Sequence, residues 1–77
     1  MNLPDAIRKV SRGEDLAREE MGQVMHIIMS GDATPAQIGA VLTALHIKGE
    51  TVEELTGAAM VMREFAANVS VQADQVA

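Results

Sequence analysis

Apolar residues recur at helical spacing in four separate stretches of the chain. Each stretch has the i, i+3, i+4, i+7 pattern that places apolar side chains on one face of a helix. No stretch in this set alternates long enough to predict a strand. The four stripes are Leu3, Ala6, Ile7 and Val10; Met21, Val24, Met25 and Ile28; Ile38, Val41, Leu42 and Leu45; and Leu55, Ala58, Ala59 and Met62, extended by Phe65 and Ala66. The pattern predicts an all-α fold, a small four-helix domain with orthogonal or antiparallel helices.

Start and stop signals delimit these helices. Residues 34–37 (Thr-Pro-Ala-Gln) and 51–54 (Thr-Val-Glu-Glu) each form a capping box, in which the Thr side chain and the residue three positions later satisfy each other's backbone N–H groups. A glycine follows each of the first three stretches, where a left-handed residue closes a helix; these are Gly13, Gly31 and Gly49. Short connections between four helices are therefore expected.

The second helix has a weaker start than the others. Ala17 stands where a Ser or Thr would complete a capping box with Glu20, and Asp15 is an alternative cap. In the first helix, Asp5 and Lys9 are spaced as an i, i+4 ion pair.

The third helix is apolar on nearly every side, which is typical of a helix covered on more than one face. We expect it to contact another subunit or domain through Ala40, Val41, Ala44, Leu45 and Ile47. Simple packing in the domain's own core stays open as the alternative.

The character of the chain changes near its end. We interpret residues 1–67 as a helical domain and residues 68–77 as a linker toward an absent α/β domain. Val69, Val71 and Ala73 alternate with polar residues, so an extended conformation is expected there.

Composition excludes several classes of partner. The chain has 77 residues, a formal net charge of -5 and no Cys, so disulfides and thiolate metal sites are excluded. Its few basic residues are scattered and Phe65 is its only aromatic residue, which argues against nucleic acid. No apolar run is long enough for a signal peptide or a membrane span, so we expect a cytoplasmic protein without a membrane partner.

Candidate chemistry is sparse. His26 and His46 lack the spacing of a zinc site, and a triad of His26, Asp32 and either Ser11 or Ser30 has no nucleophile elbow around it. Phosphate-binding glycine motifs are absent. The six Met residues could line a peptide groove, but core filling is the favoured interpretation. We predict no catalytic, cofactor-binding or metal-binding residue.

Residues 19–66 resemble the N-terminal helical domain of the anthranilate phosphoribosyltransferase family, and the resemblance extends over nearly the whole chain. Its most specific parts are Met-Ser-Gly-Asp-Ala-Thr-Pro-Ala-Gln-Ile-Gly-Ala at 29–40, Lys-Gly-Glu-Thr at 48–51 and the segment 58–64. The one departure is Ala17 in place of the usual Ser or Thr cap, which bears only on the start of the second helix.

The resemblance implies a part of a tryptophan-biosynthesis enzyme. Enzymes of this family transfer a phosphoribosyl group from phosphoribosyl pyrophosphate to anthranilate with magnesium. They join the small domain to a large α/β domain, which carries the Gly-Thr-Gly-Gly-Asp phosphate loop and the metal-binding acids, and similar enzymes dimerise through the small domain. By resemblance this chain forms one wall of the interdomain cleft, a hinge and a homodimer contact, and it is inactive alone.

Two other interpretations stay open. The matching helical domain of a pyrimidine nucleoside phosphorylase shares this architecture, and residues 7–20 would suit it. Residues 48–51 and 62–65 favour the transferase. A free-standing helical interaction module is the alternative from a different class.

Overall fold

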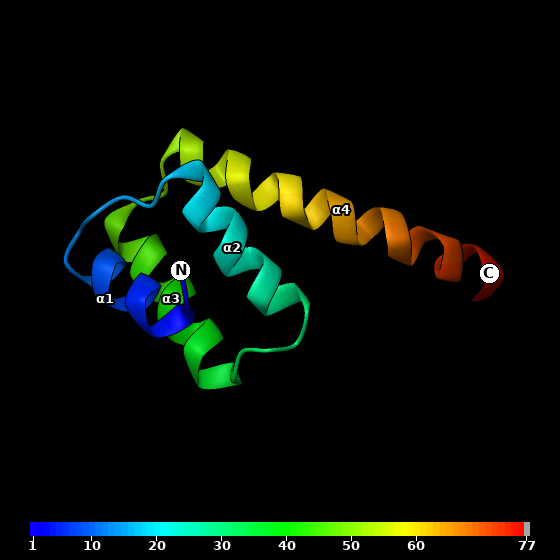
Figure 1. Ribbon diagram of the computed structural model, residues 1–77, viewed down its shortest axis with the longest axis horizontal. Coiled ribbons are helices and arrows are strands. Elements are labelled where there is room, and N and C mark those ends of the chain that lie inside the picture. The colour runs from blue at the N-terminus through cyan, green and yellow to red at the C-terminus, as the bar shows by residue number, and fades with distance from the viewer. Residues whose placement is uncertain (77) are drawn as a thin grey trace.

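The structure is a computed structural model that describes the backbone of residues 1–76 and the side chains of residues 1–67. It contains α1 (Leu3–Ser11), α2 (Arg18–Met29), α3 (Pro35–Lys48) and α4 (Val52–Val76), and the described backbone has no strand (Figure 1). The predicted all-α fold is confirmed.

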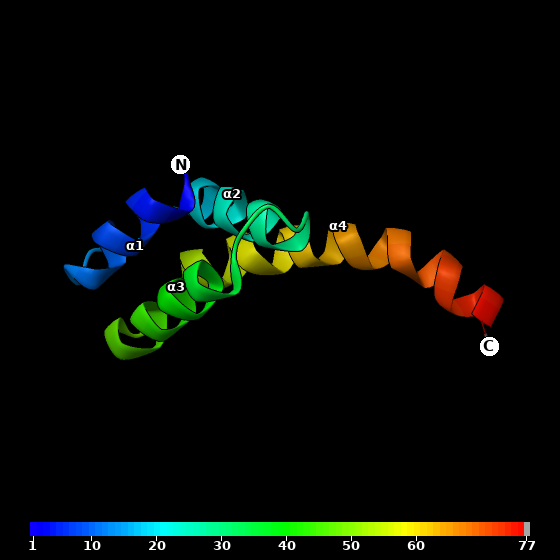
Figure 2. The ribbon, with the colours of Figure 1, turned by 90° about the horizontal axis from the view of Figure 1, so that it is seen from below.

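The helices are arranged as two pairs. α2 packs along α4 and α1 packs against α3, whereas α1 and α2 touch only slightly. Figure 2 shows the α1/α3 pair at one end of the molecule and the α2/α4 pair leading away from it. The consecutive helices α3 and α4 belong to different pairs and diverge from their short connection.

The core lies where α1, α2 and α3 meet. Its buried apolar side chains are Leu3, Ala6, Val10, Leu16, Met21, Val24, Val41 and Leu45. The stripes of the first three helices supply most of these residues, as predicted. The stripe predicted for α4 is only partly right: Ala58 packs against the core, but Leu55 and Met62 are exposed, and α4 buries Glu54 and Gly57.

The closest helix crossing involves Gly57. A Cβ atom built on Gly57 would lie 2.2 Å from the backbone carbonyl oxygen of Arg18, at the start of α2. A side chain at position 57 would therefore separate the two helices. This close approach explains why α4 turns a glycine, and not its apolar stripe, toward α2.

The predicted helix ends are largely confirmed. The Thr34 N–H donates to Gln37 Oε1 and the Gln37 N–H donates to Thr34 Oγ1, both at 3.1 Å. The three glycines after α1, α2 and α3 have φ of 83°, 79° and 90°. At α2, the Ala17 N–H donates to Glu20 Oε1 at 2.8 Å, so half of a capping box forms without a hydroxyl.

Two local predictions are wrong. Asp5 pairs with Arg8, one turn away at i+3, because Lys9 reaches across to Glu20 on α2 at 3.0 Å. Asp15 does not cap α2, because its carboxylate accepts a hydrogen bond from Lys48.

Residues 68–76 continue α4 as helix, where an extended segment was expected. No Gly or Pro occurs after Gly57, so nothing in the local sequence stops the helix. Whether residues 68–77 act as a linker to another domain stays a prediction.

Candidate functional site

The structure divides the predicted contact face of α3 between core and surface. Val41 and Leu45 are buried in the core of this chain, so they are not available to a partner. Ala40 is exposed, Ala44 is half-buried and Ile47 is 80% exposed. These three residues follow i, i+4, i+7 spacing and form one line along α3, beside the line that faces α1 and α2. Of the five predicted contact residues, these three are the ones accessible to another chain.

A second apolar surface lies between α3 and α4. We call it the α3–α4 groove, a hollow of about 330 Å³ with almost wholly apolar walls. It is lined by Met21, Met25, Leu42, Leu45, Glu50, Glu54, Leu55, Ala58 and Met62. Leu42, Leu55 and Met62 are about half exposed along it. The interpretation of the methionines as core filler is therefore right for Met21 and wrong for Met62.

The floor of the groove holds a fully buried carboxylate, that of Glu54. Its Oε2 accepts a hydrogen bond from the Leu16 N–H at 2.6 Å, and its Oε1 accepts from the Thr51 N–H and from Lys48 Nζ, both at 2.9 Å. The Lys48 side chain is only 6% exposed and also donates to Asp15 Oδ1 at 2.9 Å. We call this network the Glu54 clamp: Glu54 accepts from Leu16, Thr51 and Lys48, and Lys48 also donates to Asp15.

The clamp is electrostatically balanced. Burial raises the pKa of the Glu54 carboxyl, but the hydrogen bonds from Leu16, Thr51 and Lys48 outweigh it and hold this pKa below its ordinary value. Burial lowers the pKa of Lys48, and its bonds to Asp15 and Glu54 more than reverse that effect. Both groups therefore stay charged at neutral pH.

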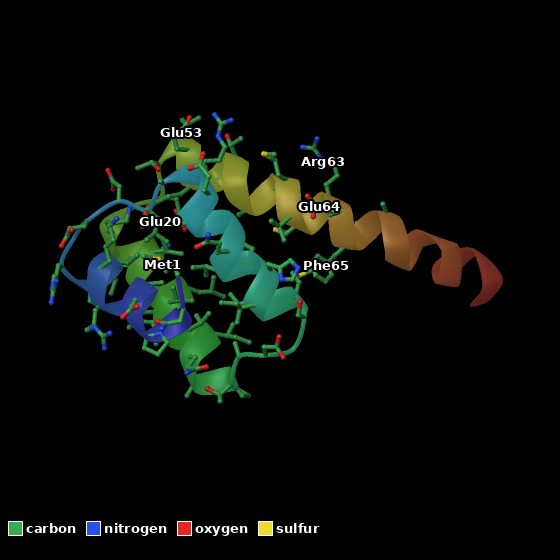
Figure 3. The ribbon with its side chains drawn as sticks, in the orientation of Figure 1. Met1, Glu20, Glu53, Arg63, Glu64 and Phe65 are labelled. Carbon is green, nitrogen blue, oxygen red and sulfur yellow. The ribbon has the colours of Figure 1, made fainter. Side chains whose placement is uncertain are left out.

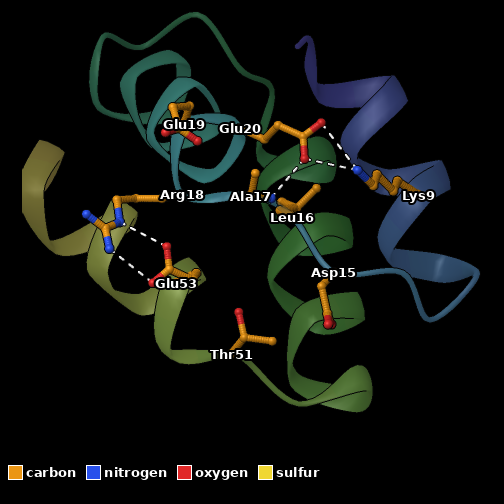
Figure 4. A pocket seen from close by; sticks show the side chains of 9 residues that line it. All are labelled: Lys9, Asp15, Leu16, Ala17, Arg18, Glu19, Glu20, Thr51 and Glu53. Atoms are coloured by element: carbon orange, nitrogen blue, oxygen red, sulfur yellow. Dashed lines mark hydrogen bonds and ion pairs between the residues drawn. The ribbon is translucent and has the colours of Figure 1, made fainter.

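A charged hollow of about 440 Å³ lies on the other side of the clamp, where the starts of α2 and α4 meet the α1–α2 loop (Figure 4). Lys9 is paired with Glu20 there, and Arg18 makes two hydrogen bonds to Glu53 at 3.0 and 3.1 Å. Because both basic groups that line this hollow already have acidic partners, it does not resemble a phosphate site. Its ion pairs link α1 to α2 and α2 to α4.

The histidine candidates do not assemble a catalytic site. His26 Nδ1 lies 3.4 Å from Ser30 Oγ, but both side chains are exposed and no hydrogen bond joins them to Asp32. The His26 ring makes an edge contact with Phe65 of α4, at 5.5 Å between centroids. Ser11 and His46 likewise take no part in a catalytic arrangement among the described side chains.

The described part of the chain holds neither a metal-binding cluster nor a membrane-spanning helix. No group of three or more His, Cys, Asp or Glu side chains there could hold a metal ion. None of the helices is long and apolar enough there to cross a membrane.

Sequence reasoning missed the Glu54 clamp. It identified Glu54 as the partner of Thr51 in a capping box, which the structure confirms, and it noted Lys48 only as a polar position. Glu54 and Lys48 are six residues apart on different helices, so no local spacing rule joins them. The visible signal was an acidic residue on the edge of an apolar stripe, next to Leu55.

Comparisons with known proteins match nearly the whole chain. A family model described as the glycosyl transferase family, helical bundle domain, matches residues 4–66. The chain is also similar to three curated bacterial proteins named anthranilate phosphoribosyltransferase. The relative from Teredinibacter turnerae is 53% identical over 76 residues, that from Cellvibrio japonicus 54% over 74, and that from Syntrophotalea carbinolica 58% over 69.

These matches cover nearly all of this chain but only a small part of each relative. They include 99%, 96% and 90% of this chain, but only 22%, 22% and 20% of the respective relatives. The chain thus spans about a fifth of the length of the curated relatives it matches.

Proposed function

The chain belongs to the helical bundle domain of the glycosyl transferase family, and from this premise we propose that it serves as the N-terminal helical domain of an anthranilate phosphoribosyltransferase. The enzyme would transfer phosphoribosyl from phosphoribosyl pyrophosphate to anthranilate in the cytoplasm. The observation that carries the proposal is the 53% identity to such an enzyme over 99% of this chain. The relatives cited bear this name, which favours the transferase over a pyrimidine nucleoside phosphorylase.

We propose that this domain acts as a hinge and a dimer contact and does not bind the reacting groups. A magnesium–pyrophosphate substrate requires a nest of backbone N–H groups and carboxylates that converge on the ion. Asp15, Glu20, Glu53 and Glu54 of the clamp and the charged hollow are engaged with Lys48, Lys9, Arg18 or backbone N–H groups. The proposal therefore places the magnesium and substrate groups in the large α/β domain, and leaves the hinge and the dimer contact to this chain.

A chimera tests the enzymatic assignment. Residues 1–67 replace the matched region of the Teredinibacter turnerae relative, and the product is expressed in a strain that lacks its own anthranilate phosphoribosyltransferase. We expect growth without tryptophan, because the domain carries the contacts that its relatives use. The same chimera with Val41→Glu is the matched control, because a charge buried in the core should abolish growth.

The chimera has clear contrary outcomes. A folded chimera that does not restore growth would contradict the assignment. Purified chimera that instead cleaves a pyrimidine nucleoside with phosphate would support the nucleoside phosphorylase interpretation. The 77-residue chain assayed alone with both substrates and magnesium is expected to form no product.

The exposed line on α3 supports a homodimer. A side chain as apolar as Ile47, 80% exposed in the single chain, is typical of a surface that a partner covers. We expect the chain to sediment as a dimer at high micromolar concentration, and Ile47→Glu to shift it to monomer without a change in helical content. Thr43→Glu, on another exposed side of α3, is the control. A monomeric wild type would refute the dimer contact.

A further inference from the structure

The two helix pairs share the apolar core, and few ion pairs or side-chain hydrogen bonds cross between them. The Arg18–Glu53 ion pair links α2 to α4 and so lies within one pair. Lys9–Glu20 joins α1 to α2 across the pairs, but both side chains are about one-third exposed. The Glu54 clamp also crosses between the pairs, from α4 to α3 and to the α1–α2 loop, and its central carboxylate is fully buried.

Packing along the groove does not set the distance between α3 and α4. The space between them is an open hollow of about 330 Å³, and Leu42 of α3 and Leu55 of α4 are each about half exposed. Close-packed side chains would hold two helices at one separation, whereas a partly open apolar groove tolerates several. The helices are held at a defined separation next to their short connection, where Glu54 at the start of α4 bonds to Lys48 at the end of α3.

The geometry points to a positioning role: we propose that the Glu54 clamp sets the angle at which the α1/α3 pair is mounted on the α2/α4 pair, and with it the width of the α3–α4 groove. Glu54 and Lys48 are positioning residues in this sense. Three directional hydrogen bonds on one buried carboxylate define the positions of Leu16, Lys48 and Thr51 relative to each other.

The consequence for assembly rests on the proposed function. α3 carries the proposed dimer contact, and α4 extends beyond the other helices toward the C-terminus (Figure 1). The clamp would then set how the partner subunit is oriented relative to the rest of the enzyme. The angle itself can be measured without any assumption about the reaction.

Distance measurement between two spin labels tests the proposal. The chain has no Cys, so Ala36→Cys at the far end of α3 and Arg63→Cys on α4 give specific labelling sites. Arg63 points away from the other helices (Figure 3). With a rise of about 1.5 Å per residue, a tilt of about 15° would move the far end of the 14-residue α3 by about 5 Å. Pulsed electron paramagnetic resonance resolves such a shift.

Glu54→Gln and Lys48→Met are the test variants, and the neighbouring Glu53→Gln is the matched control because its ion pair lies within one helix pair. The labelled chain is diluted into unlabelled chain, so that only distances within one chain are recorded. We expect both clamp variants to keep their helical content and to show a shifted or broadened distance distribution, and the control to match the wild type.

Each contrary result is decisive. Folded clamp variants with the wild-type distribution would overturn the proposal. Loss of folding in both clamp variants would overturn it too, because the clamp would then hold up the fold itself and not the angle between two folded pairs. If the clamp variants keep the wild-type angle between the helix pairs and the chimera is active, only the role of the clamp is rejected. If the clamp variants change the angle and the chimera is inactive, only the enzymatic assignment is rejected.

Discussion

Gly57→Ala is the substitution for which the structure predicts the clearest change in stability. Gly57 lies inside α4, where an alanine would normally favour the helix by about 0.5–1 kcal/mol. Its new Cβ, however, would lie 2.2 Å from the Arg18 carbonyl oxygen, 3.1 Å from the carbonyl carbon and 3.3 Å from the Arg18 Cα. All three atoms belong to the backbone, so no side chain can rotate out of the way.

The size of the overlap determines the expected loss. Carbon and oxygen approach to about 3.3 Å in close contacts, so α2 and α4 would have to separate by about 1 Å. Overpacking of this kind costs typically about 1–3 kcal/mol, which exceeds the gain in helix propensity. For a domain of this size we expect the melting temperature to fall by roughly 5–15 °C.

Gly39→Ala is the matched control. Position 39 lies inside α3 and a Cβ there meets nothing within 4 Å, so only the propensity gain of about 0.5–1 kcal/mol remains. Thermal unfolding followed by far-UV circular dichroism should therefore move in opposite directions for the two variants. A Gly57→Ala chain as stable as the wild type would show that the α2–α4 crossing is looser than the structure indicates.

Three further predictions follow from burial and charge. Val41→Glu should cost several kcal/mol (about 3–5) or prevent folding, whereas Thr43→Glu on the exposed side of α3 should change the unfolding free energy by no more than about 0.5 kcal/mol; equal effects in urea titrations would contradict the burial of Val41. Ala17→Ser should complete the capping box of α2 and raise the melting temperature, by about 0.5–1 kcal/mol of stability. The pKa of Glu54 is lower in the folded chain than its ordinary value of 4.5, so the charged carboxylate stabilises the fold above that value. This stabilisation is lost as the pH falls through the folded pKa. In an acid titration, the free energy of unfolding of Glu54→Gln should therefore fall less steeply than that of the wild type.

Helix positions and ends were predictable because their signals are local. The Thr34 and Thr51 capping boxes each act over three residues, and the backbone meets the same donors and acceptors in nearly any tertiary context. Gly13 and Gly31 take positive φ for an equally local reason. The absence of such a signal after Gly57 also explains the one long error, the helical backbone of residues 68–76.

The faces of the helices were predicted less well. Periodicity indicates which side chains share a side of a helix, but not which neighbour covers that side. α4 shows the limit: its apolar stripe, with Leu55 and Met62, lies along an open groove, while Glu54 is buried by partners on three other segments. Two residues of the predicted contact face of α3, Val41 and Leu45, are buried within the chain for the same reason, and the contact itself stays a prediction.

The sequence by itself determined four helices, their ends except that of α4, and the family to which they belong, because caps, glycines and residue patterns are properties of neighbouring residues. Only the tertiary structure decided that the helices pack as two pairs, that Gly57 rests against Arg18, and that Glu54 and Lys48 form a buried ion pair. Those contacts join residues far apart along the chain, and their energies depend on burial, which does not exist until the helices have met.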